Sequence, residues 1–247
     1  MHLRMKKAGA DLMLLGFLVK PNRNRKKGAV VQCLMKCKNK IMNITIENYI
    51  KLQQSGQVER RPKFKGHEVQ AAWIAVGQNM VKSVNPNREY DFDTNAERIM
   101  KVCFGDTIKG AIFWGSKGLG KTLNLDIFTK INRELYKIHT ECYEAEEIEF
   151  GYKAYGADYI LKLSDLPCLV INDIGRESGV LKDYGTERNI IADLLALRYR
   201  KFQTSGFRTF GSTNGTKEAV CQLYTQRIED RFNEMFNFLE LKGVSKR

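Results

Sequence analysis

The sequence predicts an α/β protein built on a mostly parallel, five-stranded sheet with helices on both faces. From Lys109 onward, short apolar segments alternate with longer amphipathic ones, which is the pattern of parallel strands joined by helical crossovers. One apolar segment leads directly into a glycine-rich loop and then into a helical pattern. With 247 residues, of which 43% are hydrophobic, the chain can bury one sizeable core.

Strands and helices are indicated by apolar composition and by spacing. Four segments are predicted strands: residues 110–114 (GAIFW), 168–172 (CLVIN), 207–213 (FRTFGST) and 236–241 (FNFLEL). A fifth strand is expected within residues 139–154, with limits that the pattern leaves open. Three segments have helical periodicity: residues 121–138, 187–202 and 217–235. Thr94 and Glu97 fit a capping box that opens a further helix.

Residues 42–88 are predicted to form a helical N-terminal region that precedes the main domain. Residues 44–52 and 69–84 carry apolar side chains at helical spacing. The segment around Pro86 interrupts the helical pattern. We therefore expect the main domain to occupy residues 89–247.

The net charge of +13 is concentrated at the N-terminus. Residues 1–41 contain eleven Lys and Arg and one acid, Asp11, so they carry +10 and the rest of the chain carries +3. Such a basic extension is suited to nucleic-acid phosphates or an acidic membrane surface. The alternatives are a solvated, disordered tail, or a natural start of translation at Met42.

The six cysteines and the apolar start of the chain favour a reduced, cytoplasmic protein with no membrane partner. Four of the cysteines lie singly in apolar or mixed segments, where a thiol packs as a small hydrophobic group. Cys33 and Cys37 are close in sequence but lack the second pair that a zinc site needs. The apolar residues 8–19 are interrupted by Asp11 and are too short to span a bilayer.

The segment GSKGLGKT, residues 115–122, matches the phosphate-binding pattern GxxxxGK[ST]. Its glycines let backbone N–H groups point at phosphate oxygens, and the N-terminus of the following helix adds a positive end. Lys121 is expected to reach the β and γ phosphates, and Thr122 to bind Mg²⁺. The alternative is a purely structural glycine loop. The predicted ATP-binding residues are Gly115, Ser116, Lys117, Gly118, Leu119, Gly120, Lys121 and Thr122.

Two later strand ends carry polar residues in the order that a P-loop ATPase uses. The second predicted strand ends at Asn172 and Asp173, where such an enzyme places one acid for the magnesium shell and another that polarises water. The third ends at Thr213 and Asn214, and an amide there can orient the attacking water. Each pair also has a simpler interpretation as the turn that ends a strand.

Two arginines lie one helical turn apart in the segment YTQRIEDRFNEM. Arg227 and Arg231 therefore project from one helix face. We interpret Arg231 as an arginine finger that acts on the nucleotide of a neighbouring subunit. The alternative is a solvated surface on which the arginines pair with Asp230 and Glu234.

Five segments in this order, GSKGLGKT, CLVINDIGRE, YGTERNIIADLLALRYR, RTFGSTN and YTQRIEDRFNEM, resemble the AAA+ P-loop ATPases of the DnaC/DnaI helicase-loader and IstB transposition-helper family. The resemblance covers about residues 94–241 and implies ATP-dependent assembly on DNA. Loaders of this family deliver a ring helicase, and the IstB type assists a transposase.

The resemblance assigns roles to single residues. It implies that Thr122, Asn172 and Asp173 hold magnesium. It implies that Asp173, Asn214 and Arg231 take part in catalysis. One position departs from the family: Asn172 stands where an acid is expected, and an amide offers an oxygen but no negative charge.

The sequence thus predicts a cytoplasmic, ATP-dependent DNA-replication protein: an ATPase that binds single-stranded DNA, forms an ATP-dependent homo-oligomer and loads a replicative helicase. Hydrolysis is expected to be slow because of Asn172. A transposase-assisting ATPase is the alternative within the same class. A nucleotide-gated binding module with little turnover is a second, supported by Asn172. A P-loop kinase is a third, although the sequence shows no plain lid or second substrate site.

Overall fold

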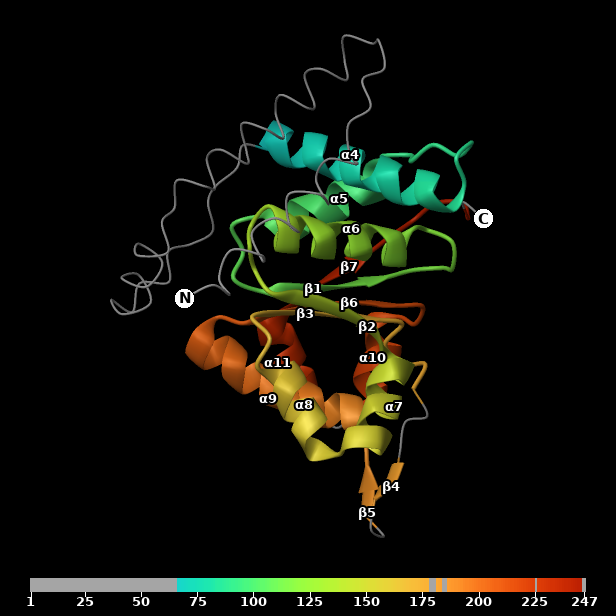
Figure 1. Ribbon diagram of the computed structural model, residues 1–247. Helices are drawn as coiled ribbons and strands as arrows, with labels where there is room; N and C mark the ends of the chain where they lie inside the picture. Colours follow the sequence, from blue (N-terminus) through green and yellow to red (C-terminus); the bar gives the residue numbers. More distant parts are fainter. Residues whose placement is uncertain (1–65, 178–180, 184–185, 225, 246–247) are drawn as a thin grey trace, which may run out of the picture.

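The computed structural model describes residues 66–177, 181–183, 186–224 and 226–245 (Figure 1). The basic extension 1–41, the predicted helix at 44–52 and the cysteine pair 33 and 37 lie outside the described residues. The described part of the chain forms the sheet and the helical layers of this fold.

The core is a five-stranded sheet in the order β2-β3-β6-β1-β7, in which each neighbouring pair of strands is parallel (Figure 1). The predicted α/β fold class is therefore confirmed. β6 lies between β1 and β3, so the loops that follow these three strands meet at one edge of the sheet, where α/β proteins bind ligands. The strands are β1 Gly110–Trp114, β2 Thr140–Glu144, β3 Cys168–Asn172, β6 Arg208–Thr213 and β7 Phe236–Glu240.

Helices cover both faces of the sheet (Figure 1). On one face lie α4 Gly66–Val84, α5 Thr94–Phe104 and α6 Lys121–Glu134. On the other lie α7 Ala145–Tyr155, α8 Ala157–Ser164, α9 Ile190–Ser205, α10 Lys217–Leu223 and α11 Gln226–Met235. Successive residues of a strand supply the two layers in turn: Ala111 and Phe113 of β1 face α6, whereas Ile112 packs in the opposite cluster. Burial on both faces explains why β1 and β3 are largely continuous apolar runs.

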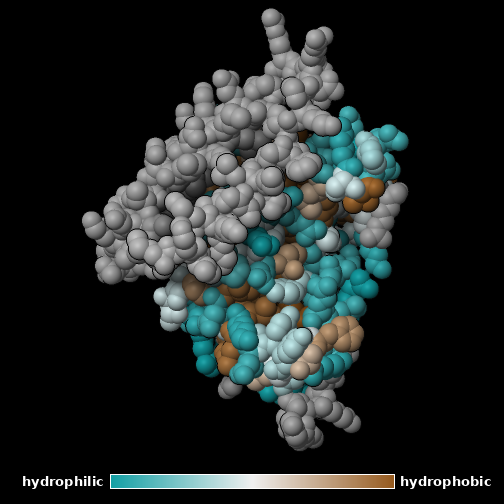
Figure 2. All heavy atoms as spheres, in the orientation of Figure 1, coloured by the Kyte–Doolittle hydropathy of each residue, from teal (hydrophilic) through white to brown (hydrophobic). Residues whose placement is uncertain are grey.

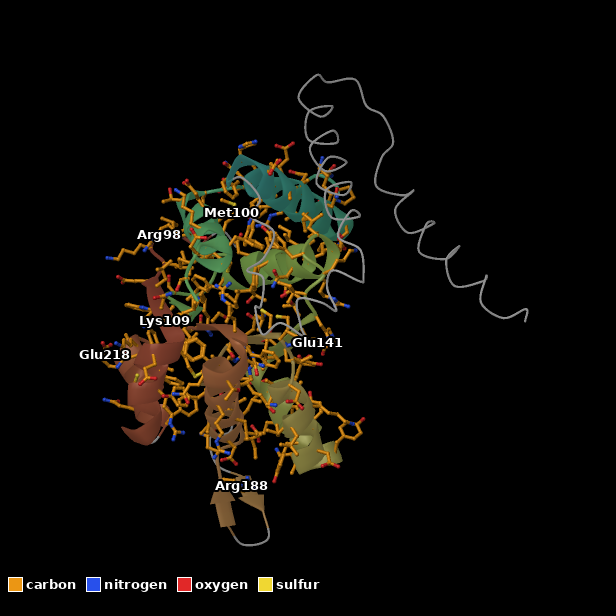
Figure 3. The ribbon with its side chains drawn as sticks, turned by 90° about the vertical axis from the view of Figure 1, so that its left-hand side faces the viewer. Arg98, Met100, Lys109, Glu141, Arg188 and Glu218 are labelled. Carbon is orange, nitrogen blue, oxygen red and sulfur yellow. The ribbon has the colours of Figure 1, made fainter. Side chains whose placement is uncertain are left out.

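Polar contacts fasten the β7 edge of the sheet to its surroundings. Arg98 of α5 donates from Nη1 to the Glu240 carbonyl at 2.8 Å, and Lys109 donates from Nζ to the Asn233 carbonyl of α11 at 2.7 Å (Figure 3). The first contact ties α5 to β7, and the second ties the segment before β1 to α11, although the residues involved are far apart in sequence.

Two predicted helices differ from the structure. The predicted helix 217–235 is two helices, α10 and α11, because the chain becomes extended at Tyr224, whose side chain is buried and donates a hydrogen bond to Glu177. The predicted helix 187–202 begins at Ile190, where the Asn189 side chain accepts the Ala192 N–H as N-cap. The residues before it form a hairpin of β4 Leu181–Asp183 and β5 Thr186–Arg188.

Smaller differences concern element ends. The N-cap of α5 is Asp93, whose carboxylate accepts the Ala96 N–H at 2.8 Å. The predicted capping box of Thr94 and Glu97 is therefore wrong, because Thr94 is the first residue of the helix and the third is Ala96, which has no carboxylate. The strand expected within residues 139–154 is confirmed as β2, and most of α7 fills the rest of that segment. Helix α8 was not predicted, and α6 ends at Glu134 rather than at 138.

Helix α4 packs on α6 and contributes Val69, Ala72 and Trp73 to the same apolar cluster as β1. The described end of the 42–88 region is thus attached to the sheet's helical layer. The domain limits themselves stay a prediction, since most of that region lies outside the described residues.

The described surface is mainly hydrophilic on the face drawn in Figure 2, with hydrophobic residues scattered among polar ones. None of the helices in the described part of the chain combines the length and apolar character that a bilayer-spanning segment requires. The four described cysteines are thiols rather than disulfides.

Candidate nucleotide-binding site

The loop after β1 has a backbone that glycine makes possible. Gly115, Gly118 and Gly120 have φ of 144°, 83° and 79°, which side-chain-bearing residues adopt rarely. A Cβ at Gly115 would also lie 2.5 Å from the Leu241 carbonyl oxygen. The three glycines of the predicted phosphate loop therefore fold it into a shape that most other residues would resist.

The first turn of α6 is suited to an anion. Its N-cap, Gly120, has no side chain to satisfy the N–H groups of this turn, and the turn contains no acid. The N–H groups at the start of a helix and the helix dipole favour a phosphate at such an end. Lys121 begins this helix and Thr122, which follows it, is exposed. The residues of the loop thus fit a nucleotide phosphate.

Lys121 lies under the loop and connects it to β6. Its side chain is 5% exposed, and Nζ donates to the carbonyls of Gly115 at 2.7 Å and Ser116 at 2.9 Å. Nζ also donates to Oδ1 of Asn214 at 3.0 Å. Asn214 follows the last residue of β6, and the pairing of Trp114 with Thr213 places the ends of β1 and β6 side by side. Two of the predicted functional residues are therefore in direct contact.

Asp173 joins the same group from the end of β3. Its φ of 51° turns the chain out of the strand, and its N–H donates to Ser212 Oγ at 3.1 Å. Its carboxylate accepts from Asn214 Nδ2 at 3.4 Å and from Arg176 Nη1 at 2.9 Å. A continuous chain of contacts therefore runs from Lys121 through Asn214 to Asp173. Arg176, which sequence reasoning passed over, is present in CLVINDIGRE, one turn after the acid.

Asn172 points into the protein instead. It is 2% exposed, and its Oδ1 accepts from Ser212 Oγ at 3.1 Å while its Nδ2 donates to Cys142 Sγ at 3.3 Å. The amide thus bridges β2, β3 and β6, and a carboxylate could not donate to the sulfur. The magnesium role of Asn172 stays a prediction, and it would require the Ser212 hydrogen bond to open.

The β2 side of this edge is acidic and partly desolvated. Burial raises the pKa of the Asp126 carboxyl, an effect opposed by a hydrogen bond from Cys142. Burial also raises the pKa of Glu144, and the charges of Asp173 and Glu147 raise it further. Such surroundings favour a nearby cation.

Magnesium would be held mainly by nucleotide phosphates at this edge. Among the described residues, no group of three or more Asp, Glu, His or Cys is arranged to enclose a metal ion. Mg²⁺ in nucleotide sites needs no such cage, because it keeps several waters and takes one or two protein ligands besides the phosphates. Thr122 and Asp173 are the residues that fit this requirement.

Arg231 lies apart from this group. Its guanidinium stacks over the ring of Tyr199 of α9 at 5.2 Å, and the Tyr199 hydroxyl donates to Glu234 at 2.6 Å. None of the contacts that connect Lys121, Asn214 and Asp173 involves Arg231. The side chains of Arg227 and Asp230 lie outside the described residues.

No family model matches this sequence, and no curated protein matches it. Several solved structures do. A candidate primosome component from Streptococcus pyogenes serotype M3 is 16% identical, covers 64% of this chain and 85% of its own, and has a TM-score of 0.49. The DnaC helicase loader is 18% identical over 75% of this chain and 95% of its own, with a TM-score of 0.45.

The replication initiator DnaA, in a structure bound to AMPPCP and single-stranded DNA, is 11% identical over 61% of this chain and 46% of its own, with a TM-score of 0.48. Helicase loaders and replication initiators are thus among the solved structures similar to this chain. The functional proposal is carried by the residues of the site.

Proposed function

We propose that the protein is an ATPase of the AAA+ type that binds ATP with Mg²⁺ at residues 115–122 and acts in DNA replication. The observation that carries the proposal is the contact chain from Lys121 through Asn214 to Asp173. It joins a phosphate-binding loop, an amide and an acid at the ends of three adjacent strands. A structural glycine loop would not need these three groups together.

Each group has a role in ATP chemistry. Lys121 exchanges its loop carbonyls for β- and γ-phosphate oxygens, which are charged acceptors. Thr122 and Asp173 would hold Mg²⁺, which would neutralise phosphate charge. Asp173 polarises the attacking water, and Asn214 orients it. Because Asn214 contacts both Lys121 and Asp173, movement of Lys121 onto a γ-phosphate changes the surroundings of the acid.

Slow hydrolysis follows from the same contacts. Asn172 brings no charge and has both ends of its amide engaged. Asp173 is shared with Arg176, which occupies one carboxylate oxygen at 2.9 Å. The protein would therefore remain in an ATP-bound state for a long time. This favours, as a second candidate, a nucleotide-gated binding module with little turnover.

Isosteric exchanges at the two neighbouring positions test this assignment. Asn172→Asp is expected to raise the rate of phosphate release several-fold, because it adds a charge beside the acid and removes the N–H donor that holds this side chain to Cys142. Asp173→Asn is expected to lower it at least about tenfold, since general acid–base groups contribute about 10²–10⁴ in rate. Phosphate release at saturating ATP measures both. A wild-type rate that Asp173→Asn leaves unchanged would contradict the role of Asp173.

DNA binding is proposed for the N-terminal segment on the basis of charge. Residues 1–65 contain sixteen Lys and Arg and three acids, so they carry the whole net charge of +13 and residues 66–247 are neutral. Single-stranded DNA is the polyanion that fits a cytoplasmic replication protein, and a replicative helicase is the proposed cargo. A transposase is the alternative partner.

Arg231 is proposed to act on the nucleotide of a neighbouring copy in a homo-oligomer, because its contacts do not involve the phosphate loop of the same chain.

Deleting residues 1–41 is expected to weaken binding to single-stranded DNA and to flatten its salt dependence. Removing one cation that neutralises a phosphate reduces the log–log slope by about 0.7 for single strands. The slope is measured by titrating a labelled oligonucleotide at several salt concentrations. The ATP affinity of the truncated protein serves as the control and should not change. Equal slopes for both proteins would support a solvated tail or a natural start at Met42.

A further inference from the structure

A buried group of hydrogen bonds joins helix α4 to the phosphate loop. Trp73 of α4 is fully buried, and its indole N–H lies 2.9 Å from Tyr90 Oη and 3.2 Å from Asn124 Oδ1. The Tyr90 hydroxyl donates to the same Oδ1 at 2.6 Å. Asn124 of α6 is 4% exposed and donates from Nδ2 to the Gly120 carbonyl at 2.8 Å. The series of hydrogen bonds therefore runs from Trp73 and Tyr90 through Asn124 to the Gly120 carbonyl of the phosphate loop.

The orientation of the Gly120 carbonyl sets the direction of a backbone N–H group that can donate a hydrogen bond to a phosphate. It accepts from Asn124 twice, from the backbone N–H at 3.0 Å and from Nδ2. In a planar trans peptide the C=O and the following N–H point in opposite directions. Because Asn124 fixes this oxygen toward α6, the N–H of Lys121 points away from the helix, toward the loop. That N–H is one of the donors expected to face a phosphate.

The aromatic donors determine which way the Asn124 amide points. An amide has one oxygen that accepts and one nitrogen that donates. With the Trp73 and Tyr90 donors on Oδ1, Nδ2 is directed at Gly120. Without them the oxygen would be buried and unsatisfied, so the amide would gain by turning toward other partners. If these hydrogen bonds served only to satisfy the indole and the phenol in the core, they would not need to involve Asn124, the residue that also binds the Gly120 carbonyl.

Tyr90 is itself held firmly by α4. A Cβ on Gly77 of α4 would lie 2.7 Å from the Tyr90 ring, so the ring packs directly on the helix backbone. The Tyr90 N–H donates to Gln78 Oε1 at 3.1 Å. Burial raises the pKa of Tyr90, which keeps its hydroxyl a neutral donor at any ordinary pH. The orientation of Asn124 thus depends on the position of α4.

We propose that Trp73 and Tyr90 are positioning residues of the nucleotide site. They orient Asn124, which holds the Gly120 carbonyl and so aims the Lys121 N–H at the bound phosphate. Helix α4 is then part of the support of the phosphate loop. This inference rests on the proposed binding of ATP and names residues outside the loop on which ATP affinity depends.

The test uses the full chain with the double variant W73F/Y90F, which keeps both rings and removes both donors. Its dissociation constant for ATP is expected to rise about threefold to tenfold, as for the loss of one hydrogen bond. Val69→Ala is the control, because Val69 is buried on the same helix and has no polar side-chain atom. It is expected to lower the melting temperature while keeping the ATP affinity within about twofold of wild type.

A second readout needs no nucleotide. Amide hydrogen exchange in the segment 115–122 is expected to be faster in the double variant than in wild type, and unchanged in Val69→Ala. Unchanged exchange in the double variant overturns the inference, as does an equal increase in the control. If the wild type binds no ATP, the proposed function fails, whereas the exchange experiment still decides whether the two donors hold the loop.

Discussion

Lys121→Ala is expected to weaken ATP binding by about a hundredfold or more. Nζ lies beneath the loop, among the carbonyls of Gly115 and Ser116 and beside Asn214. From there it can reach two phosphates, and each hydrogen bond to a charged group is worth about 1.5–3 kcal/mol. Two such bonds correspond to at least a hundredfold in affinity, because about 1.4 kcal/mol is a factor of ten. Isothermal titration with ATP and Mg²⁺ measures the change.

Lys117→Ala is the matched control for this experiment. Lys117 belongs to the same loop but is exposed, so its loss removes an equal charge without removing the amine beneath the loop. Its affinity for ATP is expected to stay within a few-fold of wild type. An affinity of Lys121→Ala within about fivefold of wild type would refute the phosphate-loop assignment, and equal losses in both variants would indicate a general charge effect. Melting curves of both variants exclude unfolding as the cause.

The parts of the fold that follow from local patterns could be predicted from the sequence. β1 and β3 coincide with the predicted strands 110–114 and 168–172, because parallel strands buried on both faces are continuous apolar runs. The glycine loop could be predicted because its backbone requires residues without a side chain, as at Gly115. These features depend on neighbouring residues along the chain.

The features that could not be predicted depend on strand order and on distant contacts. The amide of Asn172 bridges Cys142 and Ser212, a role that arises only because β3 lies between β2 and β6. The helical periodicity of 217–235 continues through Tyr224, and the break there reflects a contact with Glu177, 47 residues away in sequence.

The candidate site likewise contains residues that a local pattern predicts and residues whose role depends on distant contacts. Lys121, Asp173 and Asn214 were singled out from the sequence by their motifs, and the parallel sheet brings them into a chain of contacts. The support of the loop by Trp73 could not be predicted, since a tryptophan in a helical apolar pattern indicates burial but not its hydrogen-bond partner, 51 residues away. Arg176 was missed because an arginine after a turn is an ordinary surface residue by pattern.

A second large effect is expected at the other end of the sheet, where Arg198 of α9 is fully buried. Its Nε donates to Thr209 Oγ1 at 2.9 Å, and its Nη atoms donate to the carbonyls of Ser164 at 3.0 Å, Arg208 at 2.6 Å and Leu166. Burial lowers the pKa of Arg198 to about 10, so the guanidinium remains charged at neutral pH. One side chain therefore ties the loop before β3 to the start of β6.

Arg198→Leu is expected to lower the free energy of unfolding by about 3–5 kcal/mol, because several buried acceptors lose their donors at once. The acceptors are a hydroxyl and three backbone carbonyls, and they stay in place when the guanidinium is removed. Each acceptor left buried and unsatisfied costs about 1–3 kcal/mol. Urea denaturation monitored by circular dichroism measures the loss. Arg200→Leu, at an exposed position of the same helix, should stay within about 0.5 kcal/mol of wild type. If the urea midpoint of Arg198→Leu equalled that of wild type, water or a rearranged loop would have to satisfy those carbonyls. Arg198 would then not be the residue that holds this end of the sheet together.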